Sequence, residues 1–133
     1  MTRSANRVTA LLAGAALAAL GIAGIVASLL GAAEETPLLA GVLPTNGAQG
    51  GLHLALGAAL LVAGIAGRRA AKTVNVVAGV VLFVLGYAGL FVVGTPYDVL
   101  GMSGAANVVH FAAATLLLAV GIGTERPRAS PSR

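Results

Sequence analysis

Four long stretches without a charged residue constrain this chain more than any other feature of its sequence. Each is at least 20 residues long: Val8–Leu30, Ala48–Gly67, Thr73–Gly94 and Gly104–Gly123. A helix that crosses the hydrocarbon core of a bilayer needs about 20 predominantly apolar residues. Only 9% of the residues are charged, whereas a soluble domain carries about 25%. The sequence therefore predicts an all-α integral membrane protein, a bundle of four spanning helices in a single domain.

The charged residues predict the orientation of these spans. The basic residues fall in three segments, at the N-terminus, between the second and third spans, and in the C-terminal tail: Arg3, Arg7, Arg68, Arg69, Lys72, Arg126, Arg128 and Arg133. Four spans bring these three segments to the same side of the membrane, and three of the four acidic residues, Glu34, Glu35 and Asp98, to the other side. Because cytoplasmic loops are enriched in Lys and Arg, we expect a multi-pass protein of the cytoplasmic membrane with both termini in the cytoplasm. The net charge of +4 is then explained by topology, and we expect no nucleic-acid partner.

The chain also repeats itself. Aligning the first span with the third at an offset of 65 residues superposes Gly14 on Gly79 and Gly21 on Gly86. Aligning the second with the fourth at an offset of 57 superposes His53 on His110. The sequence therefore predicts two tandem, parallel helix-pair repeats, about 7–67 and about 72–123. We expect a tight basic turn from Arg68 to Lys72 between them, and a disordered tail over 124–133.

Polar side chains inside the spans are the candidate functional residues, because they are costly in hydrocarbon. We single out His53, His110, Asn107, Gln49 and Tyr87. The two histidines occupy equivalent repeat positions, which predicts that they face each other or share one central cleft. A metal ion held by this pair alone is not expected, because zinc sites use three or four protein ligands.

Three hypotheses explain the histidine pair. It can be a structural contact in which a neutral imidazole ties helices together. It can be the axial ligand set of a haem b, with glycines on neighbouring helices making room for the macrocycle. It can also be a proton-titrating or small-ligand site, since histidine titrates near neutral pH.

No catalytic motif supports an enzyme. The chain has no Cys, no phosphate-binding glycine loop and no Gly-x-Ser-x-Gly nucleophile elbow. We therefore expect a non-enzymatic accessory or scaffold element that contacts the lipid bilayer and either self-associates or joins a larger membrane complex. A haem-binding electron carrier and a small-solute or ion pathway are the two alternatives.

Two short motifs carry a family resemblance. Asn107-Val108-Val109-His110 and Gly50-Gly51-Leu52-His53 stand at the starts of the fourth and second spans. They resemble the actinobacterial membrane family catalogued as "domain of unknown function 4383", which has an Asn-x-x-His element in the fourth of four helices. Gly50 departs from that element, because an Asn would be expected there. The resemblance covers about Arg7 to Ile122; it implies a bacterial cytoplasmic membrane and no particular activity.

Overall fold

Each of the four apolar stretches forms one continuous α-helix in the computed structural model, which describes residues 4–31, 38–39 and 43–123. The helices are α1 (Ala5–Leu30), α2 (Gly47–Ala66), α3 (Arg68–Val92) and α4 (Gly104–Gly123). The shortest have 20 residues, which at about 1.5 Å per residue matches a hydrocarbon core of about 30 Å. All four are long and apolar enough to cross a membrane. The chain is therefore a multi-pass membrane protein, and the predicted disordered tail lies outside the described residues.

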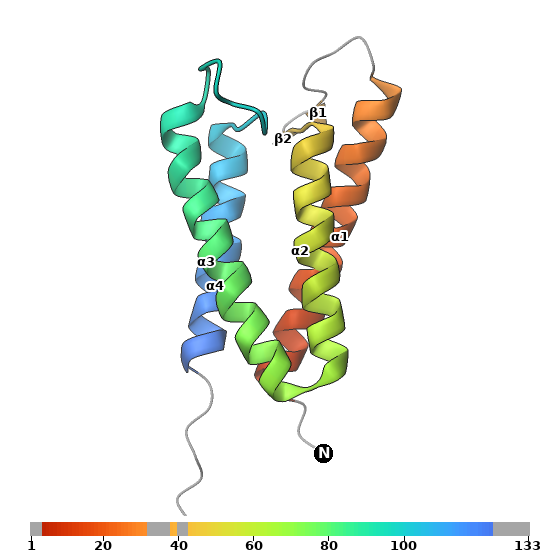
Figure 1. Ribbon diagram of the computed structural model, residues 1–133, viewed down its shortest axis with the longest axis vertical. Coiled ribbons are helices and arrows are strands. Elements are labelled where there is room, and N and C mark those ends of the chain that lie inside the picture. The colour runs from red at the N-terminus through yellow and green to blue at the C-terminus, as the bar shows by residue number, and fades with distance from the viewer. Residues whose placement is uncertain (1–3, 32–37, 40–42, 124–133) are drawn as a thin grey trace, which may run out of the picture.

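The helices are arranged as two antiparallel pairs that lie side by side (Figure 1). α1 packs along α2, and α3 packs along α4, over most of their lengths. The two pairs touch each other mainly through α3, which contacts both α1 and α2. The start of α1, the α2–α3 connection and the end of α4 lie at one end of the bundle, called the inner end below (Figure 1).

The connection between α2 and α3 is shorter than predicted. Gly67 alone joins the helices, with φ 141°. Its N–H donates to Ala63 O at 3.1 Å and its carbonyl accepts from Ala71 N at 2.9 Å, so it closes one helix and opens the next. The prediction of a basic turn from Arg68 to Lys72 was therefore wrong, because a backbone conformation open to glycine reverses the chain within one residue.

The described parts of two connections lie at the opposite end of the bundle, called the outer end below. Two-residue strands β1 (Leu38–Leu39) and β2 (Leu43–Pro44) pair antiparallel between α1 and α2. The Asn46 side chain caps α2 by accepting from Gln49 N at 2.9 Å, and it also donates from Nδ2 to Val99 O at 3.0 Å. Asn46 therefore joins the two helix pairs through their outer connections.

Close backbone approach holds α1 against α2. A Cβ on Gly57 of α2 would lie 2.5 Å from Ala18 N and 2.7 Å from Gly14 O of α1. A Cβ on Gly21 of α1 would lie 2.7 Å from Gly50 O of α2. Lipid supplies no hydrophobic force between helices, so small residues that admit close van der Waals contact are what make such a pair stable.

A leucine layer fills the middle of the bundle. One leucine from each helix is buried there: Leu17, Leu60, Leu82 and Leu117. Buried alanines surround them. This layer is continuous with the contacts within each helix pair, so the core runs across all four helices.

Two glycines on one helix allow a matched test of the α1–α2 contact. Gly57→Ala should lower the free energy of unfolding by about 1–3 kcal/mol, because its methyl group overpacks the α1 backbone. Gly51→Ala, on the same helix, is exposed with nothing within 4 Å of its added Cβ. It should leave stability unchanged or raise it by up to about 1 kcal/mol through helix propensity. Chemical unfolding in detergent, followed by circular dichroism, measures both; equal effects would contradict the packing described above.

Candidate functional site

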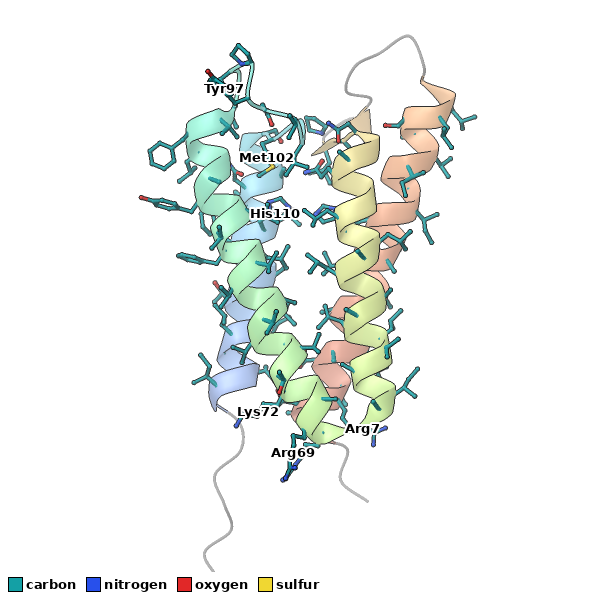
Figure 2. All side chains as sticks on the ribbon, viewed as in Figure 1. Arg7, Arg69, Lys72, Tyr97, Met102 and His110 are labelled. Atoms are coloured by element: carbon teal, nitrogen blue, oxygen red, sulfur yellow. The ribbon has the colours of Figure 1, made fainter. Side chains whose placement is uncertain are left out.

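A pair of buried histidines joins the two helix pairs near the outer end. His53 on α2 and His110 on α4 are 5% and 1% exposed. Their Nε2 atoms are 3.0 Å apart, and their rings meet edge to face at 65° with centroids 5.2 Å apart. Figure 2 shows His110 directed from α4 toward the other helix pair. No Cα of α2 comes within 8 Å of a Cα of α4, so α2 and α4 meet here through the two imidazole side chains and not through close backbone packing.

The chemistry of this contact restricts its protonation. In a hydrogen bond between two Nε2 atoms, one imidazole must donate N–H and the other must accept with a lone pair. At least one ring is therefore neutral while the contact exists. Two imidazolium rings would both be donors at this position, and they would repel each other.

Further polar side chains are buried on the outer side of the pair. The predicted candidates Gln49 and Asn107 are both buried, one turn or less from the histidines on α2 and α4. Asn107 Oδ1 and His110 Nδ1 have no hydrogen-bond partner among the described residues. A buried acceptor or ring nitrogen of this kind is unusual enough in proteins to require an explanation.

Two residues of this region were not predicted. Thr45 is buried beside Gly24 of α1, where a glycine Cβ would lie 2.6 Å from Thr45 Oγ1. Met102 is buried over Gly89 of α3, together with Asn107 Oδ1. Both directly precede an N-cap residue, and they are related by the offset of 57, so the internal alignment contained the signal that could have found them.

Tyr87 lies elsewhere. Its side chain is 56% exposed on the surface of α3 and contacts Phe91 edge to face, with centroids 5.2 Å apart. The structure therefore does not bring this candidate to the histidine pair. A polar side chain within an apolar span therefore need not point into the bundle, since the Tyr87 ring and its hydroxyl face outward.

A second buried polar contact lies at the inner end. Asn75 Nδ2 on α3 donates to both the backbone oxygen and the Oδ1 of Asn6 on α1, each at 3.0 Å. Both side chains are fully buried. Arg7, the next residue on α1, donates from Nε to Gly64 O of α2 at 2.9 Å. Polar contacts thus cross between helices on both sides of the leucine layer.

The described residues do not fit a haem. Two axial bonds of about 2 Å each, the usual length from a histidine nitrogen to a metal, would separate the Nε2 atoms by about 4 Å with a macrocycle between them. Glycines of the helices beside the histidines already contact neighbouring helices: Gly14 and Gly21 of α1 pack on α2, and Gly79 and Gly86 of α3 pack on α4. Nor does any cluster of three or more His, Cys, Asp and Glu residues occur in the described part of the chain.

The fold is a multi-pass membrane helix bundle in which buried polar contacts and a leucine layer join two helix pairs. The chain belongs to the family described as Domain of unknown function (DUF4383), which matches residues 7–123. This match confirms the family resemblance predicted from the histidine motifs. No curated protein and no solved structure matches the chain.

The histidine contact can be measured by a double-mutant cycle. His53→Ala and His110→Ala should show a favourable coupling of about 0.6–1.7 kcal/mol, the range of polar contacts between membrane helices. His53→Ala combined with Asn75→Ala, at the opposite end, should be additive within about 0.5 kcal/mol. Unfolding in bicelles gives both values, and a zero coupling for the histidines would show that their contact contributes nothing to stability.

Proposed function

We propose that this protein is a non-enzymatic scaffold element of the cytoplasmic membrane, built from two parallel repeats and self-associating through its second repeat. The observation that carries this proposal is a difference between otherwise equivalent surfaces. Most positions buried in one repeat are also buried in the other, whereas the outer faces of α1 and α3 carry different kinds of side chain. The interiors of the two repeats are similar, but the outer face of α3 differs from that of α1. We therefore expect the outer face of α3 to bind a partner.

Equivalent interior contacts support the repeat. The histidines are related by 57 residues, as are Leu60 and Leu117, and all four are buried. The same offset relates the helix caps: Asn46 accepts from Gln49 N, and Ser103 Oγ accepts from Ala106 N at 3.0 Å. Cap, histidine and leucine therefore follow the same spacing in α2 and α4.

The basic residues support a cytoplasmic inner end. Arg68, Arg69 and Lys72 lie in the first turns of α3, and Arg7, Arg69 and Lys72 lie at the inner end of the bundle (Figure 2). Cations at a helix N-terminus oppose the helix dipole, at a cost of about 0.3–1 kcal/mol each. Helix stability therefore does not account for them, whereas the enrichment of Lys and Arg in cytoplasmic connections does.

Cysteine labelling tests this orientation without background, because the chain has no native Cys. Tyr97→Cys, at the exposed outer connection, should react with a membrane-impermeant maleimide on intact cells. Arg69→Cys should react only after the membrane is permeabilised. Labelling of Arg69→Cys from outside intact cells would reverse the proposed topology.

An aromatic ridge supports self-association through α3. Phe83, Tyr87 and Phe91 follow each other at four-residue spacing, and all are exposed on one face. The offset of 65 puts Ala18, Ile22 and Val26 at the equivalent positions of α1. In membrane proteins Trp and Tyr are enriched at the interface with water. Phe83 lies two turns, about 12 Å, inward of Phe91, which is deeper than such a belt requires.

A shallow groove on α4 lies beside this ridge. Its lining is mostly small and apolar: Val108, Phe111, Ala112, Thr115, Leu116 and Ala119. Phe111 belongs to the groove and meets Phe83 of the ridge edge to face, with centroids 5.7 Å apart. A ridge and an adjoining groove on one surface are self-complementary about a two-fold axis, which is the commonest symmetry of homo-oligomers. A second copy of this chain is therefore the partner that we propose.

Disulfide crosslinking tests this surface. Val84→Cys, which is 57% exposed and leaves the aromatic residues intact, should give a covalent dimer when membranes are mildly oxidised. Ile22→Cys, 54% exposed at the position of α1 equivalent to Tyr87, is the matched control and should stay monomeric. Size analysis in mild detergent should show a homo-oligomer. A monodisperse monomer, or equal crosslinking from both positions, would contradict the proposal.

The two alternative functions have less support. A haem-binding carrier would need a slot that the described glycine contacts fill, as shown above. A solute or ion pathway along the bundle axis would have to pass the leucine layer, whose four side chains are almost fully buried against each other and their neighbours. Neither alternative is favoured by an observation of its own.

A further inference from the structure

We propose that His53 and His110 form a two-coordinate binding site for a soft monovalent cation, Cu(I), with Ag(I) as its redox-inactive equivalent. The site is independent of the proposed self-association, since the histidines lie inside the bundle and the aromatic ridge lies on its surface. The inference rests on three properties of the site: the geometry of the two Nε2 atoms, the absence of a negatively charged ligand among the two histidines, and the unpartnered atoms beside them.

The geometry is about 1 Å short of what a cation held linearly between two nitrogens requires. The two Nε2 atoms already face each other at 3.0 Å, one from each helix pair. With metal–nitrogen bonds of about 2 Å, linear coordination needs about 4 Å. The rings therefore have to separate by only about 1 Å. A bare ion needs no slot for a macrocycle, so the close glycine contacts that exclude a haem do not exclude it.

The charge of the surroundings selects a monovalent ion. Both ligands are neutral imidazoles, and the carboxylate of Asp98 is engaged by Met102 N at 2.8 Å in the outer connection. A divalent ion without a negative ligand would be strongly disfavoured in a low-dielectric interior, where burying uncompensated charge costs several kcal/mol. Zinc also prefers four ligands, and imidazole is a ligand of copper as well as of zinc. The donor set therefore favours Cu(I) over Zn²⁺.

The two unpartnered atoms would be paired by binding. A cation on Nε2 of His110 fixes the proton on Nδ1, which then needs an acceptor. Asn107 lies one helical turn away on α4, and its Oδ1 has no partner, like His110 Nδ1 itself. A change of the Asn107 rotamer toward the ring would join them. Metal-binding histidines usually donate their second N–H to an oxygen in this way. Asn107 is thus a positioning residue for the site.

The test uses the full chain, purified in detergent, with Cu(I) titrated anaerobically against a chromophoric Cu(I) chelator and Ag(I) titrated by calorimetry. We expect one equivalent of each ion. Asn107→Ala should weaken binding by about 10–100-fold, the usual effect of losing a residue that orients a metal ligand, and loss of either histidine should weaken it further. Asn75→Ala is the matched control, because Asn75 Oδ1 is also buried without a partner but lies at the inner end. It should leave the affinity unchanged.

Two measurements keep the test decisive if a variant unfolds. Ag(I) added to ¹⁵N-histidine-labelled wild-type protein should shift the Nε2 resonances of both histidines. X-ray absorption of the Cu(I) complex should show two nitrogen ligands in linear geometry. Binding of less than half an equivalent above a detergent blank, an unchanged affinity in both histidine variants, or a spectrum without imidazole ligands would each overturn the proposal.

Discussion

The approach of the α1 backbone to the α2 backbone is the contact on which the rest of the bundle depends. In hydrocarbon a helix gains little by hiding an apolar face, so helices associate only where their surfaces fit closely. The glycines of this pair let atoms of one backbone touch atoms of the other. The second pair is built differently, since Gly79 and Gly86 of α3 receive the side chains of Leu118 and Phe111. The α1–α2 pair is thus held by contacts between the two backbones. The α3–α4 pair is held by contacts of the α3 backbone with side chains of α4.

The two pairs are joined by a different kind of interaction. Leucines meet in the middle, and hydrogen bonds between buried side chains lie toward each end, Asn6 with Asn75 and His53 with His110. A polar group in lipid gains from any partner, so such contacts set the register of the halves even where each contributes about 1 kcal/mol or less. The apolar layer supplies contact area, and the polar contacts specify how the two pairs are aligned.

The sequence predicted the spans well and their ends less well, for a physical reason. Hydropathy detects where charges begin, whereas a helix ends where its backbone hydrogen bonds end. Arg68, Arg69 and Lys72 were therefore assigned to a turn although they belong to α3. The histidine contact followed from equal positions in two similar segments. The outward position of Tyr87 and the buried position of Asn6 did not follow from the sequence. The rotation of a nearly all-apolar helix about its axis depends on packing that hydropathy does not encode.

The single-residue connection at Gly67 has a mechanical consequence. α2 and α3 belong to different helix pairs and are connected by Gly67 alone, so a rotation about this glycine would displace their outer ends more than their inner ends. His53 lies 14 residues from Gly67, which is about 21 Å along the helix. A rotation of about 3° at the glycine displaces the imidazole by about 1 Å at that lever length. A small change of angle at Gly67, near one membrane surface, would thus change the separation of the two helix pairs near the other.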